Sequence, residues 1–340
     1  MRPSAGTVRG AITVLRSAPF GGLFSVAILD FVQIIIIMGG MLYIGSVISG
    51  LAGGVERVVT HAAMAGKLDF FPPARMEAWI PFLGAWVTMM FGSIPQQDVF
   101  QRITSARDER TAVRGSVLGG TLYFFFAFVP MFLAYSATLV DPAQVAQLLE
   151  RDSQLILPNL IVQHTPIVAQ IIFFGALLSA IMSCSSATLL APSVAFSENI
   201  VKGWVPTISD HGLLRVMRIV LVGFAATVLL FALNSEASIF KMVESAYKVT
   251  LVAAFVPLLA GLYWARATTQ GAVLAITVGL GSWCGSELTV TLDQIWPPQL
   301  VGLLAAAVGM VAGSLLPQWI EHPAGLSASG NRPSLSSPVE

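Results

Sequence analysis

The chain has 340 residues, of which 55% are hydrophobic and only 11% are charged, and its mean hydropathy is +0.78. Because soluble domains carry roughly 25% charged residues, this composition excludes an ordinary soluble protein. The 18 Lys and Arg residues balance the 18 Asp and Glu residues, and the two cysteines, Cys184 and Cys284, both lie in apolar stretches. A nucleic-acid partner, a disulfide framework and a Cys-rich zinc site are therefore excluded.

Apolar windows divide most of the chain into membrane-spanning segments. A spanning helix needs about 20 mostly apolar residues. Charge-free windows occur at residues 31–55, 78–97, 115–140, 165–197, 219–235, 249–265, 267–286 and 294–320. We therefore predict an all-α polytopic membrane protein with about eight transmembrane helices. Only Arg266 separates the sixth window from the seventh, which predicts a helical hairpin there.

The two ends of the chain differ from its middle. Residues 1–20 are basic and acid-free, which predicts a cytoplasmic flank rather than a cleavable signal peptide. Residues 321–340 are rich in Ser, Pro and Gly and predict a disordered tail. Residues 21–320 form the predicted membrane domain. An N-terminus inside the cell puts most Lys and Arg residues on the inner side, so we predict a cell-membrane protein with both termini cytoplasmic.

Asp30 lies near the start of the first apolar window. A charged side chain at the centre of a span costs about 2.5–3.5 kcal/mol, so such residues usually face a cavity or a partner. Gln33, three residues on, lies on the same helical face. Two interpretations stay open: a functional carboxylate inside the membrane, or an acid near the inner interface that reaches water.

The fourth window contains a run of hydroxyl side chains. Ser179, Ser183 and Ser186 fall on one helical face, and Pro192 follows. Hydroxyl and carbonyl oxygens suit a hard cation such as sodium, and serine and proline can loosen a helix and free its carbonyls. The alternative is close helix packing through small residues.

The second window is interrupted by Gly92 and Pro95. A broken span exposes backbone polar groups, which is tolerated where they line a cavity, and such segments are typical of transporter binding sites. The alternative is a helix that ends at the inner surface. The charged stretch 101–110 that follows is interpreted as a solvated loop, with a salt-bridge latch as the alternative.

Several catalytic motifs are absent from the sequence. It contains no phosphate-binding P-loop, no H-E-x-x-H motif and no G-x-S-x-G motif. We predict that the protein is not an enzyme and needs no cofactor and no metal beyond sodium.

Four segments resemble the sodium:solute symporter family. They are G-G-L-F-S-V-A-I-L-D-F-V-Q at 21–33, Q-R-I-T-S-A-R at 101–107, the stretch from L-S-A-I-M-S at 178–183 to E-N-I at 198–200, and G-L-Y-W-A-R-A-T-T-Q-G-A at 261–272. They occur in the family's order and cover most of residues 21–285. The resemblance implies a LeuT-type fold of two inverted five-helix repeats.

This resemblance implies that only part of the family fold is encoded here. The first window matches the fifth core helix, windows two to six match core helices six to ten, and the last two are peripheral. Core helices one to four have no counterpart, so we expect an N-terminally truncated member that is incompetent in transport alone. A separate chain is one source of the missing helices.

The resemblance also implies site residues. For sodium these are the Ala180 carbonyl, Ser183, Cys184 and Asp30, although a thiol is a weak ligand for a hard ion. For the solute they are Met89, Met90, Ser93 and Gln96. The expected function is sodium-coupled transport of a small organic solute. The alternative is a non-transporting membrane sensor that works with a partner chain.

Overall fold

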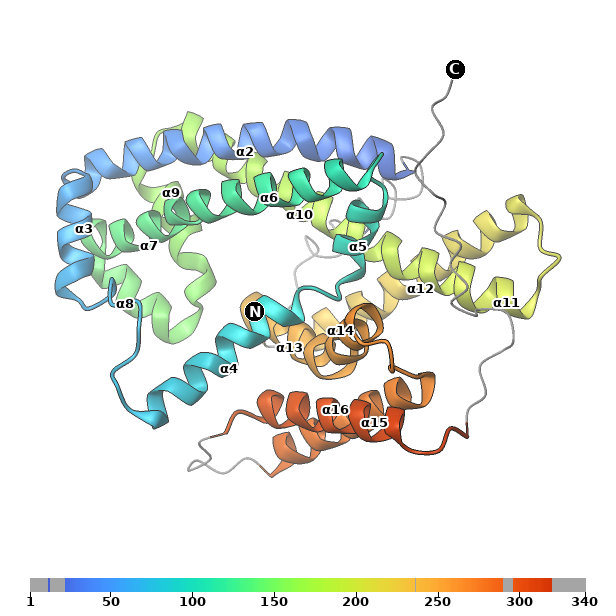
Figure 1. The fold of residues 1–340 in the computed structure, drawn as a ribbon. Helices are drawn as coiled ribbons and strands as arrows, with labels where there is room; N and C mark the ends of the chain where they lie inside the picture. Colours follow the sequence, from blue (N-terminus) through green and yellow to red (C-terminus); the bar gives the residue numbers. More distant parts are fainter. Residues whose placement is uncertain (1–11, 13–21, 236, 290–295, 320–340) are drawn as a thin grey trace, which may run out of the picture. The chain divides into compact units, whose positions relative to one another are not determined.

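The computed structural model describes residues 12, 22–235, 237–289 and 296–319, and every regular element in these ranges is helical (Figure 1). The predicted flank 1–20, apart from Ile12, and the predicted tail 321–340 lie outside the described residues. The helices group into two compact units. The chain passes between the units at residues 71–72, 96–97 and 238–239.

Unit 1 is built around two long helices. Its elements are α2 (Gly22–Ala52), α3 (Val55–Met64), α5 (Gln97–Thr104), α6 (Glu109–Phe126), α7 (Phe128–Val140), α8 (Pro142–Arg151), η1 (Ser153–Leu155), α9 (Ile156–His164), α10 (Ile167–Phe196), η2 (Ser197–Val201), α11 (Lys202–Trp204) and α12 (Asp210–Asn234). α2 packs against α7 and α10, and α10 also packs against α12. The core contains Ile44, Ile48, Leu133, Ile161 and Phe173. In a bilayer such contacts stabilise by close packing rather than by leaving water.

Short polar residues fix where several unit 1 helices begin. The side chain of Asp108 accepts a hydrogen bond from the Thr111 backbone N–H at 2.7 Å at the start of α6. Asp141 caps α8 in the same way, and Pro142 follows it as the first helical residue. The short α8 and α9 occupy a segment between the third and fourth predicted spans. Each cap satisfies an amide that the first helical turn leaves unpaired.

Unit 2 contains a closely packed helix pair. Its elements are α4 (Met76–Gly92), α13 (Ile239–Thr250), η3 (Leu251–Phe255), α14 (Val256–Tyr263), α15 (Thr269–Leu288) and α16 (Pro298–Leu315). α15 packs along α16 through small residues: a Cβ at Gly302 would lie 3.0 Å from the Gly279 carbonyl oxygen. Glycine therefore lets the two backbones approach. The predicted hairpin is confirmed, since α14 ends at Tyr263, α15 begins at Thr269, and the two helices pack together.

Seven helical segments among the described residues are long and apolar enough to cross a membrane. They are Asp30–Ala52, Glu109–Val140, Ile167–Trp204, Asp210–Asn234, Ile239–Tyr263, Thr269–Leu288 and Pro298–Leu315. Each overlaps one of the predicted windows. The remaining window, 78–97, is occupied by α4, which is 17 residues long.

Charged residues extend some spans beyond their apolar windows. The span predicted from residue 249 already begins at Ile239, so its predicted start is wrong. Glu244 and Lys248, one helical turn apart, form an ion pair at 3.4 Å inside the added part. Because each charge offsets the other, a helix can continue through a segment that a charge-free window excludes.

Candidate functional site

Asp30 and Ser183 meet where α2 packs against α10. The Ser183 hydroxyl donates a hydrogen bond to Oδ1 of Asp30, and both residues are half-buried. The two residues are 153 positions apart in the sequence. A carboxylate and a hydroxyl are thus brought together on two long helices of unit 1.

Arg102 on α5 is the third member of this cluster. Its Nη2 lies 3.2 Å from Oδ2 of Asp30, with side-chain exposures of 43% for Arg102 and 26% for Asp30. Both Asp30 oxygens therefore have a donor. The interpretation of residues 101–110 as a solvated loop is wrong for its first part, because residues 97–104 form α5 and Arg102 makes an ion pair.

The other residues predicted for sodium flank Ser183 on α10. Ala180 and Cys184 are both exposed, and the Cys184 carbonyl accepts a hydrogen bond from the Thr188 hydroxyl at 2.8 Å. The expectation of a loosened helix around Ser183 is wrong, because α10 is continuous from Ile167 to Phe196. The Ser183 hydroxyl bonds to Asp30 instead of to its own helix. The irregular turn comes later, as the π-helix η2.

The predicted break in the second window is confirmed. α4 ends at Gly92, two turn hydrogen bonds follow, Ile94 N–H to Phe91 O at 3.2 Å and Gln96 N–H to Ser93 O at 3.3 Å, and α5 begins at Gln97. Pro95 lacks an N–H and disfavours helical geometry in the residue before it, which explains the break.

Thr250 satisfies the carbonyl group that the end of α4 exposes. Its hydroxyl lies 2.6 Å from the Gly92 carbonyl oxygen, and Nε2 of Gln96 donates to the same hydroxyl at 3.2 Å. A Cβ at Gly92 would clash with the Tyr247 carbonyl oxygen, so the close approach of α13 requires glycine. Thr250 is not among the site residues that the sequence predicts. The only signal was an isolated hydroxyl at the start of the sixth apolar window.

The residues predicted for the solute lie at this same end of α4. Met89 is exposed, whereas Met90, Ser93 and Gln96 are half-buried. The Ser93 hydroxyl donates to the Met90 carbonyl at 2.9 Å. The side chains described at this α4 break are therefore uncharged, with Gln96 as the main polar one. Phe91 stacks on Phe255 of the π-helix η3, with ring centroids 4.8 Å apart.

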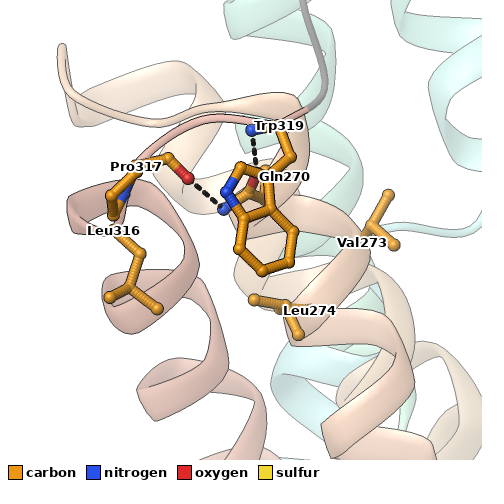
Figure 2. A pocket seen from close by; sticks show the side chains of 6 residues that line it. All are labelled: Gln270, Val273, Leu274, Leu316, Pro317 and Trp319. Atoms are coloured by element: carbon orange, nitrogen blue, oxygen red, sulfur yellow. Dashed lines mark hydrogen bonds between the residues drawn. The ribbon is translucent and has the colours of Figure 1, made fainter.

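A separate apolar cavity of about 430 Å³ lies at the start of α15 (Figure 2). It is lined by Gln270, Val273, Leu274, Leu316, Pro317 and Trp319. Gln270 donates to the Pro317 carbonyl at 3.1 Å and accepts from the Trp319 N–H at 2.7 Å. Its amide thus fastens the segment after α16 to α15, which is a structural role. Over the part of the chain that the structure describes, no group of three or more His, Cys, Asp or Glu could hold a metal ion.

Comparison with known proteins gives consistent matches. Residues 5–279 match the Sodium:solute symporter family. The chain is 26% identical over 315 residues to the Sodium/pantothenate symporter of Haemophilus influenzae, covering 89% of this chain and 63% of that protein. It is 28% identical over 318 residues to the Osmoregulated proline transporter OpuE of Bacillus subtilis, covering 88% and 61%. It is 28% identical over 278 residues to the human High affinity choline transporter 1, covering 76% and 46%.

A solved structure of a Na⁺-coupled sialic acid symporter, in a substrate-bound outward-open state, has a similar fold. The TM-score is 0.71 at 19% identity, and the match covers 91% of this chain and 66% of that one. At this identity the likeness concerns the fold. This chain spans about one-half to two-thirds of the length of the curated relatives described above.

Proposed function

Because the chain belongs to the sodium:solute symporter family, a family of membrane transporters rather than enzymes, we propose that it takes part in sodium-coupled transport of a small organic solute. The observation that carries this proposal is the hydrogen bond between Ser183 and Asp30. It joins a hydroxyl and a carboxylate inside apolar helices, where such groups are costly unless they bind a partner.

Sodium binds between α2 and α10 in this proposal. Asp30 supplies the charge and Ser183 a neutral oxygen, and both are hard ligands of the kind an alkali cation prefers. The Ala180 carbonyl adds a further oxygen. Cys184 contributes least, because its sulfur is soft and its side chain is exposed. Sodium entry down a 100 mV potential supplies about 2.3 kcal/mol per ion for the coupled movement of solute.

The solute binds at the α4 break, through Met89, Met90, Ser93 and Gln96. An apolar lining with few polar side chains suits a small organic ion or an amino-acid-like molecule better than a sugar. The relatives named for pantothenate, proline and choline transport support this class of solute.

The proposed architecture is part of a five-plus-five inverted repeat in the cell membrane, with both termini cytoplasmic: the last helix of the first repeat, all of the second repeat and two peripheral helices. α2 takes the place of the fifth core helix, α4 of the sixth and α10 of the eighth. The relatives are longer than their match to this chain. We therefore expect transport to need their additional helices, whether the same polypeptide or a separate chain supplies them.

Sodium binding by the purified 340-residue chain in nanodiscs tests the site. Radioactive sodium is titrated at constant ionic strength for the wild type and for Ser183→Ala. We expect the variant to need about three- to tenfold more sodium, because it loses a hydrogen-bonding oxygen next to a charge. Ser116→Ala on α6 is the control, because that hydroxyl bonds to its own helix, at the Ala112 carbonyl. If the two substitutions change the sodium requirement equally, Ser183 is not a sodium ligand.

Uptake by proteoliposomes tests the coupling. Vesicles that hold only this chain are given an inward sodium gradient and labelled proline, choline or pantothenate. We expect sodium binding without uptake. Sodium-driven uptake would contradict the need for further helices while supporting transport itself.

A further inference from the structure

The ion pair between Arg102 and Asp30 places a positive charge of the protein where the proposed function places sodium. We propose that Arg102 is a tethered cation that competes with sodium for the Asp30 carboxylate. This inference rests on the proposed sodium site. It adds a residue that sets the affinity of that site without itself binding the ion.

The distances support a direct competition. Asp30 has two carboxylate oxygens: Oδ1 accepts from Ser183, and Oδ2 lies 3.2 Å from Nη2 of Arg102. A sodium ion that used both the carboxylate and the Ser183 hydroxyl would lie within a few ångströms of the guanidinium. Two cations beside one partly buried carboxylate repel each other, so one of them must leave.

Arg102 is also suited to leaving. Its side chain is 43% exposed, so the guanidinium can move into water without losing a buried environment. Ion pairs between side chains as exposed as these are weak, so sodium can displace the guanidinium from Asp30. The helix α5 keeps the guanidinium close to Asp30, so it returns when sodium departs.

The competition has a functional consequence. While sodium is absent, the positive charge of Arg102 offsets the negative charge of the Asp30 carboxylate. This pairing limits the free-energy cost of an unpaired charge between the helices. When sodium binds, it must displace this partner, so its apparent affinity is lower than the intrinsic affinity of the site. A weaker site releases the ion more easily on the side where sodium is scarce.

A purely structural role is the competing explanation for the same ion pair. The two explanations predict opposite signs. If Arg102 only holds α5 against Asp30, its removal loosens the site and weakens sodium binding. If Arg102 competes with sodium, its removal strengthens sodium binding.

The experiment measures radioactive sodium binding to the full chain in nanodiscs. We expect Arg102→Gln to lower the apparent Kd for sodium about three- to tenfold. Arg102→Lys keeps a positive charge and is expected to stay near the wild type. Arg107→Gln is the matched control: it removes the same charge five residues away, from a side chain that is 89% exposed and pairs with Asp108. Arg102→Met, which keeps an apolar stem, replaces the Gln variant if that one does not fold.

Addition of methylguanidinium to the Arg102→Gln protein provides a second measurement. At millimolar concentration, methylguanidinium should compete with sodium for Asp30 and raise the apparent Kd for sodium again. In the wild type, where Arg102 already pairs with Asp30, the same concentration should raise this Kd less.

The outcomes separate this inference from the proposed function. Tighter binding in Arg102→Gln, with no change in Arg107→Gln, supports the competition. Unchanged or weaker binding in Arg102→Gln, beside a wild type that binds sodium, overturns the inference alone. Equal tightening in both variants overturns it too, because a general charge effect then explains the result. Absence of sodium binding in the wild type and in Arg102→Gln contradicts the proposed sodium site, and the inference fails with it.

Discussion

The Asp30 cluster in unit 1 and the α4 break in unit 2 both bring polar groups into apolar stretches, but by different means. The Asp30 cluster (Asp30, Arg102 and Ser183) is charged, and its members come from three helices. The α4 break is neutral. Its polar groups include the Gly92 carbonyl, the Thr250 hydroxyl and the Gln96 amide.

A charged site and a neutral site select their ligands differently. A carboxylate attracts any small cation strongly, and its strength depends on which other charges lie near it. A neutral break discriminates by shape and by hydrogen-bond geometry instead. If the ion binds in unit 1 and the solute in unit 2, as proposed above, substitutions in each region should affect one ligand more than the other.

The largest expected effect comes from Asp30→Asn. The substitution removes the carboxylate that attracts sodium in the proposed site and leaves Arg102 without this partner, so we expect sodium affinity to fall about 30-fold or more. Radioactive sodium binding in nanodiscs measures it. Asp108→Asn is the control, because it removes the same charge from a carboxylate paired with Arg107 outside the cluster. A wild-type sodium affinity in Asp30→Asn would break the assignment of the ion to unit 1.

The positions of the helices could be predicted well because hydropathy is a local property. Seven predicted windows fall on helices long enough to span a bilayer, and the break at Gly92 and Pro95 lies where the two residue types predict it. The π-helix η3 was not predicted. Pro257, which lacks an N–H and lies just after η3 at the start of α14, was its available signal.

The site contacts could be predicted only in part, because they depend on packing between distant segments. Asp30 and Ser183 were each singled out by chemistry unusual for an apolar helix, yet no local pattern indicates that their side chains meet. The charges around Arg102 are typical of solvated segments, so the sequence alone predicts a loop there. Its role depends on Asp30, 72 residues away.

A smaller effect is expected from Thr250→Val. The substitution removes the hydroxyl that lies against the Gly92 carbonyl and accepts from Gln96, at a cost of about 1–3 kcal/mol for the unsatisfied groups. We expect a thermal midpoint lower by several degrees, measured by tryptophan fluorescence, and an unchanged sodium affinity. Thr250→Ser keeps the hydroxyl and should restore the midpoint. Weakened sodium binding in Thr250→Val would show that the two regions do not act on separate ligands.

The smallest effect, a change in thermal midpoint, is expected from the substitution of Asp108. It tests how much an arginine–carboxylate pair contributes in exposed surroundings, in contrast to the partly buried pair of Asp30. Asp108 also pairs with an arginine, Arg107, at 3.1 Å, but in an exposed turn. The hydrogen bond from the Thr111 backbone, followed by Thr111's side chain and Arg107, lowers the Asp108 pKa below its ordinary value of 3.8.

Because that pKa is lowered on folding, the carboxylate stabilises the protein above pH 3.8, and this contribution is lost as the pH falls through the lowered pKa. Asp108→Asn keeps a good helix cap but does not titrate. We expect the thermal midpoint of the wild type to exceed that of the variant by at most about 2 °C at neutral pH, and the difference to vanish in acid. A difference that is constant over the whole pH range would mean that the charge of Asp108 is not its source. A loss of sodium affinity in Asp108→Asn as large as that in Asp30→Asn would mean that an exposed carboxylate outside the cluster matters equally, which would remove the physical basis of the comparison.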